Sequence, residues 1–149
     1  MQNANQRTPE QQKNLYVKRK KSKAMIRNML LIVKKAVRLM NDVDFYWEWP
    51  HLCQGWQIPE MLAIRDFLER HGRCWKGARV DGCRYGMMDV DQGQLVRKMW
   101  RVMTTSEDYV NMFGRKVCMG DHEHTPIEGK QTSTTSYYPR RWCVSMARF

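Results

Sequence analysis

The residues best suited to chemistry are a cysteine and two histidines in one short segment. Cys118, His122 and His124 lie within seven positions of one another. Zinc binds thiolate sulfur and imidazole nitrogen in tetrahedral sites, so the segment predicts three of the four ligands of a zinc ion. Cys83 and Cys143 are the candidates for the fourth ligand. The alternative is a polar surface loop with two histidines, because the spacing lacks the paired ligands of a strong zinc motif.

Two carboxylates are further candidates for catalysis or ligand binding. Glu48 lies near the end of an aromatic run, residues 45–49, that predicts a strand covered on both faces. At the carboxyl end of such a strand it would face the crevice where α/β proteins bind ligands, and it could accept hydrogen bonds from a base edge. The alternative is a simple pair with an arginine. Asp81 precedes a turn at 82–86 and is expected to orient Arg84 or an arginine of the next strand, unless the turn is an ordinary one.

The positive charge of the chain is concentrated at its N-terminal end. The net charge is +11; residues 1–40 hold eleven Lys or Arg and one acid, and residues 41–149 hold fifteen and fourteen. Such a segment attracts phosphate backbones through counterion release. The basic residues expected on one face of a predicted helix are Lys20, Lys23, Arg27, Lys34 and Arg38. A solvated helix face and a nuclear localisation signal at 18–21 are the alternatives.

Two further basic residues, Arg97 and Arg101, fall on one face of a predicted strand. Neighbouring guanidinium groups could clamp a phosphate or hold a carboxylate. The alternative is an edge strand that is protected from further pairing by its charge. With the helix, these residues predict nucleic acid as the partner, and we expect DNA rather than RNA.

Length and composition limit the class of protein. A chain of 149 residues fits one domain, and we expect a disordered tail at 1–12 and a single α/β domain at 13–149. No apolar run is long enough to cross a membrane and no secretory signal is visible, so we expect an intracellular protein, nuclear or cytoplasmic. Five irregularly spaced cysteines favour reduced thiols over a disulfide framework.

The periodicity of apolar residues predicts the order of the elements. Helices are expected at 10–40, 59–71, 107–113 and 138–149, and strands at 43–50, 78–81 and 94–104. The apolar stripe of the first helix is Ile26, Met29, Val33, Val37 and Met40. The predicted fold class is α/β, with a partial, mostly parallel sheet, flanking helices and a long basic N-terminal helix. Glycine-rich phosphate-binding loops are absent from the sequence.

The ordered motifs resemble the C-terminal half of a domain found in retroelement-type polyproteins, which is itself similar to the DNA cytosine-5 methyltransferases. The motifs that carry the resemblance are residues 45–50, Trp56, 81–86, 98–100, 104–105, 118–124, Gly129, Thr132 and 138–139. The resemblance implies that Glu48 binds a base and that Tyr85-Gly86 and the Arg97/Arg101 strand match later motifs. The cysteine nucleophile turn and the S-adenosylmethionine loop of that family are missing here. The resemblance therefore implies no S-adenosylmethionine binding and no catalysis by this chain alone, and a missing N-terminal half or second subunit as partner.

Three hypotheses follow from these residues. The first is a catalytically inactive, methyltransferase-like half domain from a mobile element that associates with nucleic acid. The second is a zinc-stabilised nucleic-acid-binding module with no enzymatic ancestry. The third is a metal-dependent nuclease that uses Asp121, His122 and His124, which ranks last because hydrolytic metals need a second cluster of carboxylates.

Overall fold

The chain divides into two compact units. The computed structural model describes residues 7–89, 92–125, 135 and 137–149. The helical unit comprises residues 1–43 and 55–71, and the sheet unit comprises residues 44–54 and 72–149. We predicted a tail at 1–12 and one domain at 13–149; the first helix begins at Pro9. Among the described residues, no helix combines the length and apolar character needed to cross a membrane.

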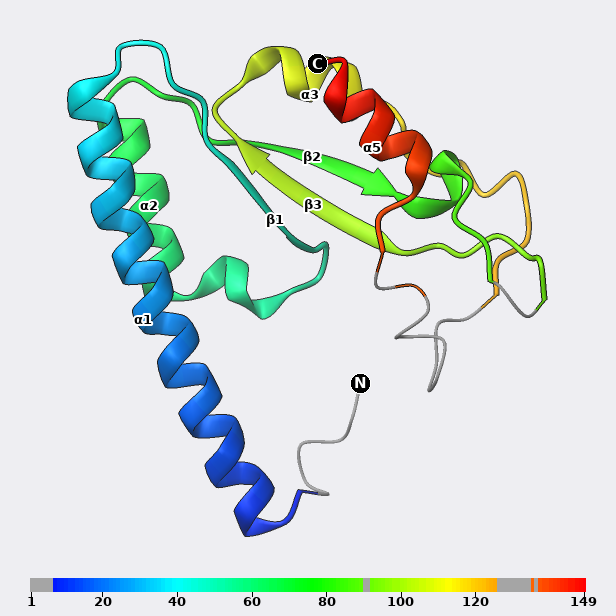
Figure 1. Ribbon diagram of the computed structural model, residues 1–149, viewed down its shortest axis with the longest axis horizontal. Coiled ribbons are helices and arrows are strands. Elements are labelled where there is room, and N and C mark those ends of the chain that lie inside the picture. Colours follow the sequence, from blue (N-terminus) through cyan, green and yellow to red (C-terminus); the bar gives the residue numbers. More distant parts are fainter. Residues whose placement is uncertain (1–6, 90–91, 126–134, 136) are drawn as a thin grey trace. The chain divides into compact units, whose positions relative to one another are not determined.

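The helical unit consists mainly of two helices that lie side by side (Figure 1). Helix α1 spans Pro9–Leu39 and begins with a capping box, in which Thr8 and Gln11 bond each other's backbone N–H groups. Helix α2 spans Pro59–Arg70, follows the short 3-10 helix η2 (Gln54–Gln57), and ends before Gly72, which has a positive φ of 73°. Both predicted helices are confirmed.

The apolar stripe of α1 is narrower than we predicted. Ile26 and Val33 are buried, whereas Met29 and Met40 are 37% and 51% exposed. On α2 the buried side chains are Met61, Ile64, Phe67 and Leu68. One short facing helix covers only a narrow strip of a long one, which explains why part of the predicted stripe stays in contact with solvent.

The sheet is antiparallel throughout, so the predicted mostly parallel sheet is wrong. Strands β1 (Tyr46–Pro50), β2 (Lys76–Asp81) and β3 (Met99–Thr104) form a three-stranded sheet in the order β1-β3-β2. Strand β3 runs antiparallel to both neighbours. Parallel neighbours need a crossover connection, usually a helix. After β2 the chain instead folds back on itself, with an antiparallel bridge between Met88 and Leu95.

Strand β1 also differs from its prediction, because it lies at an edge of the sheet and is not buried on both faces. Tyr46 is 43% exposed, and no residue of β1 is fully buried. Pro50 ends the strand as expected, since proline cannot donate to the ladder. The predicted strand at 94–104 enters the sheet only from Met99; Leu95 and Val96 make isolated bridges instead.

The core of the sheet unit lies on one face of the sheet. Helix α3 (Glu107–Phe113), as predicted, and helix α5 (Arg140–Ala147) lie beside it (Figure 1). The 3-10 helix η3 (Gly82–Tyr85) follows β2 directly and contacts α5. The core cluster joins strand residues with aromatic residues of these helices and includes Val80, Trp100, Val102, Tyr109, Phe113 and Trp142. Because Val80 of β2 and Tyr85 of η3 both belong to this cluster, the core holds the turn after β2 in place.

Candidate metal centre

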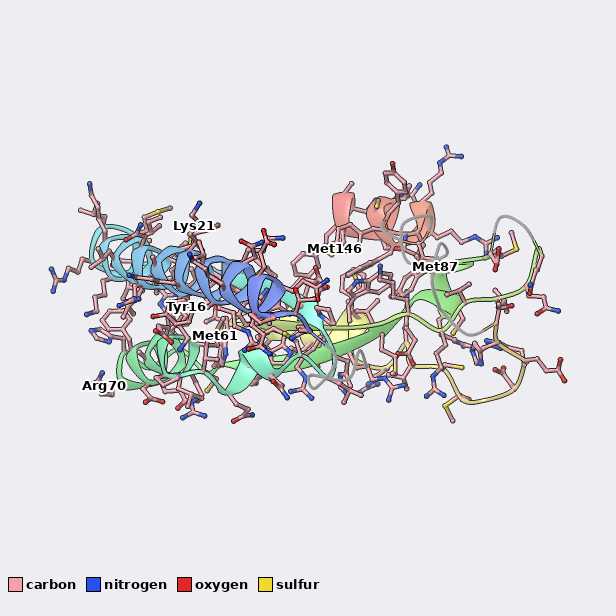
Figure 2. The ribbon with its side chains drawn as sticks, turned by 90° about the horizontal axis from the view of Figure 1, so that it is seen from below. Tyr16, Lys21, Met61, Arg70, Met87 and Met146 are labelled. Carbon is pink, nitrogen blue, oxygen red and sulfur yellow. The ribbon has the colours of Figure 1, made fainter. Side chains whose placement is uncertain are left out.

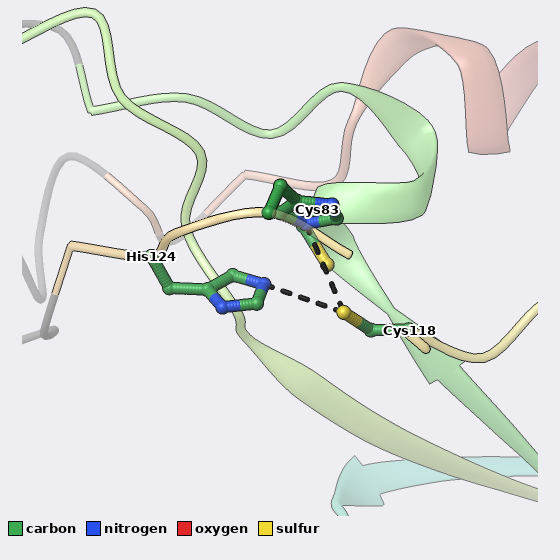
Figure 3. A group of neighbouring side chains, drawn as sticks. Cys83, Cys118 and His124 are labelled. Carbon is green, nitrogen blue, oxygen red and sulfur yellow. Dashed lines mark hydrogen bonds between the residues drawn. The ribbon is translucent and has the colours of Figure 1, made fainter. Parts of the chain in front are cut away.

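Four predicted metal ligands meet at the end of β2. One donor atom each from Cys83, Cys118, His122 and His124 lies within 4.8 Å of every other, and the two cysteines are buried. The Cys118 Sγ atom is 3.8 Å from the His122 Nε2 atom and 3.4 Å from the His124 Nε2 atom. Figure 3 shows Cys83, Cys118 and His124 turned toward one another. Cys143, the other candidate for the fourth ligand, is exposed on α5 and lies outside this cluster.

The separations of the donor atoms fit a tetrahedral metal ion. With Zn–S bonds of about 2.3 Å and Zn–N bonds of about 2.05 Å, a tetrahedral angle places sulfur and nitrogen ~3.6 Å apart. The two observed S···N distances, 3.4 and 3.8 Å, lie on either side of that value. The group could therefore bind a metal such as zinc with small shifts of its side chains.

A buried carboxylate fixes the backbone of Cys118. Asp81, the last residue of β2, is fully buried, and its Oδ2 atom accepts a hydrogen bond from the Cys118 N–H at 2.8 Å. Its two oxygens also accept from Arg79 Nε and a terminal nitrogen of the same guanidinium, at 2.8 and 2.9 Å. Such a two-point pair of charged groups is both strong and directional. Asp81 thus ties the loop that carries Cys118 to the strand that precedes Cys83.

Glycine is needed where the chain turns from β2 toward the cluster. A Cβ atom on Gly82 would lie 2.8 Å from the Met87 sulfur and 3.2 Å from the Trp100 ring. Gly86 ends η3 with a φ of 75°, in the left-handed region that glycine adopts without strain. The tight turn at 82–86 places the Cys83 thiol at the end of the sheet, where the loop with Cys118 passes.

The histidines are oriented by their neighbours. The Nδ1 atom of His122 is 2.9 Å from an oxygen of Asp121, so its Nε2 atom is directed to Cys118. A carboxylate on the second ring nitrogen is the usual partner of a metal-binding histidine. Directly after His124, the Thr125 N–H donates to the Leu95 carbonyl at 2.9 Å. This bond holds the end of the loop against the segment that precedes β3.

Burial favours the neutral thiol of Cys83 and the neutral imidazole of His124, so zinc would displace the thiol proton when it binds. Burial, with the neighbouring Cys118 thiol, raises the pKa of Cys83 to about 11. Burial, followed by electrostatic effects of His122 and Arg97, lowers the pKa of His124 and favours the neutral imidazole that ligates metals. A bond from its own backbone N–H lowers the pKa of Asp121, with smaller effects from His122 and Arg84.

The two predicted carboxylates have partners other than those we expected. Asp81 pairs with Arg79 of its own strand, while Arg84 lies 3.5 Å from Asp121. Glu48 accepts a hydrogen bond from the Tyr138 hydroxyl group. Glu48 lies opposite Val102 in the ladder, so it shares the face of the sheet that carries the core, and not the face of Arg101. Of the two arginines predicted on that strand, Arg101 therefore cannot be the partner of Glu48.

The predicted basic residues fall into two groups. Arg101 lies in β3 directly opposite Arg79 of β2, and Arg97 is exposed before the strand begins. On α1, Arg27 lies 4.0 Å from Glu60, and the Lys34 ammonium lies 5.8 Å from the Phe67 ring centre. Within the described residues, no carboxylate forms an ion pair with Lys20, Lys23 or Arg38 of that helix. Figure 2 shows the side chains of α1, among them Tyr16 and Lys21.

Sequence reasoning named Asp81 and Asp121 but missed their contacts with the metal ligands. The bond from Asp81 to Cys118 joins positions that are 37 residues apart, and no spacing pattern announces it. The link between Asp121 and His122 could have been found, because an acid beside a candidate ligand suits a supporting role.

Comparisons with protein-family models, with curated proteins and with solved structures each gave no match to this chain.

Proposed function

We propose that Cys83, Cys118, His122 and His124 bind one zinc ion and that the chain is a zinc-stabilised nucleic-acid-binding module. The observation that carries the first half of this proposal is the convergence of four donor atoms within 4.8 Å. Two sulfur and two nitrogen donors are the ligand set of structural zinc sites. Two thiolates would also neutralise the charge of a divalent cation in this partly buried position.

The ligand count favours a structural role over a catalytic one. Catalytic zinc sites keep one coordination position open for water or substrate, whereas structural sites are closed by four protein ligands. Here the protein itself supplies all four donors. Zinc would then join η3 to the loop of residues 118–124, and its binding energy would add to the stability of the sheet unit.

Metal analysis of the purified chain tests the site. We expect about one zinc ion per chain by the ligand count of such sites, and loss of that ion in the variant Cys118→Ser. Cys143→Ser is the matched control, because it removes an exposed thiol outside the cluster. Folded, metal-free protein that takes up no added zinc would contradict the proposal, as would equal zinc loss in both variants.

The nucleic-acid half of the proposal is supported by α1. The helix carries ten Lys or Arg residues and a single acid, Glu10. Lys20 and Arg38 are exposed, Lys23 is half-buried, and the described part of the chain offers these three no ion-pair partner. A row of unpaired cations along a helix is suited to a phosphate backbone, which it binds by releasing counterions.

A salt titration of DNA binding tests this role. The variant Lys20→Gln/Lys23→Gln/Arg38→Gln removes three charges of the predicted basic face, and Lys18→Gln/Lys21→Gln/Lys35→Gln removes three exposed charges of α1 outside that face. The slope of log K against log salt is negative. If the first set contacts three phosphates of a duplex, this slope should become shallower by about 2.7 in the variant. We expect a small change for the second set. Equal effects of both sets would show that only net charge matters, and no effect would refute the role of α1.

The other two hypotheses receive less support. The methyltransferase-like hypothesis needs Glu48 after a central strand, and β1 lies at the edge of an antiparallel sheet. The resemblance of the motifs itself stays a prediction. In the nuclease hypothesis Asp121 would bind metal, but its carboxylate faces His122 Nδ1 and Arg84. In a zinc-stabilised module, Asp121 would keep these two contacts and would orient His122 without binding the metal itself.

A further inference from the structure

Helix α1 carries a second row of apolar residues, which we call the outer stripe. Its members follow one another at intervals of four and three residues, the spacing of a heptad repeat: Met25, Met29, Ile32, Ala36 and Leu39. Met25, Ile32 and Leu39 are 68%, 58% and 71% exposed. At 3.6 residues per turn, the five positions fall within an arc of about 80°. Single exposed apolar residues are common on protein surfaces, but a continuous row of them marks an interaction site.

The outer stripe does not face α2. Ile26 and Val33, the buried side chains of α1, lie about 130° around the helix from it. Helix α2 has 12 residues and α1 has 31, so α2 covers one side of α1 over part of its length. Lys21, which lies on the same side of α1 as the stripe, points away from α2 (Figure 2). In the helical unit, the outer stripe is therefore open to a binding partner.

The spacing of the outer stripe indicates the shape of that partner. Apolar residues that repeat every 3.5 residues on average form a seam along a helix, and a second helix packs its own side chains into the gaps of the seam. From Met25 to Leu39 the seam is about 21 Å long, which corresponds to two heptads. A strand repeats its side chains every two residues and does not match this spacing. The stripe is therefore suited to one amphipathic helix.

The charges beside the outer stripe favour an acidic partner. Lys18 and Lys21 are exposed and precede the stripe on the same side of α1, and the exposed Lys35 flanks it. Within α1, no acidic residue follows Glu10. A second copy of α1 would bring two sets of ten cations together, which opposes self-association. Carboxylates beside the apolar seam of a partner helix would instead pair with these lysines, and such flanking pairs decide partner choice between helices.

We propose that the outer stripe of α1 binds an acidic amphipathic helix of a partner protein. The predicted basic face of α1, with Lys20, Lys34 and Arg38, lies about 160° around the helix from the stripe. A phosphate backbone and the partner helix would therefore contact opposite sides of α1. The stripe also shares no residue with the metal centre, so the inference holds or fails independently of zinc and of nucleic acid.

Fluorescence anisotropy with labelled synthetic peptides tests the proposal on the full chain. The first peptide has leucine at the heptad positions and glutamate beside them. The second has lysine in place of glutamate, and the third has the composition of the first in scrambled order. We expect saturable binding of the first peptide and at least about tenfold weaker binding of the others, because the second lacks the opposite charge and the third lacks the seam. Equal binding of the first and third peptides would overturn the proposal.

Two neighbouring variants locate the contact. Ile32→Gln removes an apolar side chain of the outer stripe. Leu31→Gln is the matched control, because Leu31 is 63% exposed but lies outside the stripe. Both positions face solvent, so both variants keep the fold. We expect Ile32→Gln to weaken binding of the acidic peptide about tenfold, as truncation at the centre of an interface does, and Leu31→Gln to leave it unchanged. Equal effects of the two variants would contradict a contact at the stripe.

Two other occupants of the stripe would give different results. A second copy of the chain would appear as a dimer in sedimentation equilibrium that Ile32→Gln dissociates. A membrane surface would appear as binding to vesicles of phosphatidylcholine and phosphatidylserine that Ile32→Gln abolishes and Leu31→Gln retains. Either result would overturn the proposal. We expect a monomer, and vesicle binding that is the same in the two variants.

Discussion

Replacement of Asp81 by asparagine should weaken both the fold of the sheet unit and its metal site. The carboxylate accepts three hydrogen bonds, two from Arg79 and one from the Cys118 N–H. Asparagine has one acceptor oxygen, which at the Oδ2 position still accepts from Arg79 and from Cys118; the bond from Arg79 Nε and the charge of the pair are lost, at about 1.5–3 kcal/mol. The Arg79 side chain is 30% exposed and regains some hydration. We therefore expect a loss of about 2–3 kcal/mol in the free energy of unfolding.

Two measurements on Asp81→Asn separate its effects. Urea unfolding of the zinc-loaded chain gives the loss of stability, and competition with a chelator gives the zinc affinity. Because a neutral amide oxygen accepts more weakly from the Cys118 N–H than a carboxylate does, the zinc affinity should fall about tenfold, the lower end of the usual effect of supporting residues. Asp66→Asn is the control, since Asp66 is half exposed beside Arg65 and should change stability by less than about 0.5 kcal/mol. Unchanged zinc affinity in a destabilised Asp81→Asn chain would refute the anchoring role.

Three further outcomes are expected. Burial raises the pKa of Tyr85 and of Tyr138 to about 12, whereas the unfolded chain has a tyrosine pKa of about 10. The folded state therefore holds these protons more tightly, so their contribution to stability is complete below pH ~10 and is lost toward pH ~12. Tyrosinate absorbance, followed together with circular dichroism, will check this loss. Gly86→Ala should cost about 1 kcal/mol by urea unfolding, because its φ of 75° is unfavourable for a side chain; no cost would contradict the observed turn. Thr8→Ala removes the capping box of α1 and should cost about 1 kcal/mol of helix stability, seen as faster hydrogen exchange in the first turns and not elsewhere.

Local signals predicted the helices well. The proline at position 59 and the glycine at position 72 enclose α2, as the sequence indicated. The structure adds the cap of α3, where the Ser106 side chain accepts from the Tyr109 N–H. Each of these signals acts within one turn of a helix, so the neighbouring residues contain all the information needed. The three ligands within residues 118–124 were found for the same reason: their proximity in space follows from their proximity in the chain.

The sheet and the fourth ligand depend on distant contacts, and here sequence reasoning was weaker. The aromatic run at 45–49 is as compatible with an edge strand packed by Tyr109 and Phe149 as with an inner parallel strand. Strand direction depends on how the chain returns after β2, which periodicity does not encode. Likewise, spacing alone could not choose between Cys83 and Cys143; the choice follows from the turn after β2 and from the bond between Asp81 and Cys118.

The order of the strands constrains how the sheet can form during synthesis. Strands β1 and β2 leave the ribosome before β3, yet each of them pairs with β3 and not with the other. No hairpin of the described sheet can therefore close until residue 104 has emerged, and the aromatic side chains of β1 remain uncovered until then. Unpaired, aromatic-rich segments are prone to associate with other chains. We expect nascent chains cut short before β3 to require chaperones, whereas the complete sheet would form in a single late step.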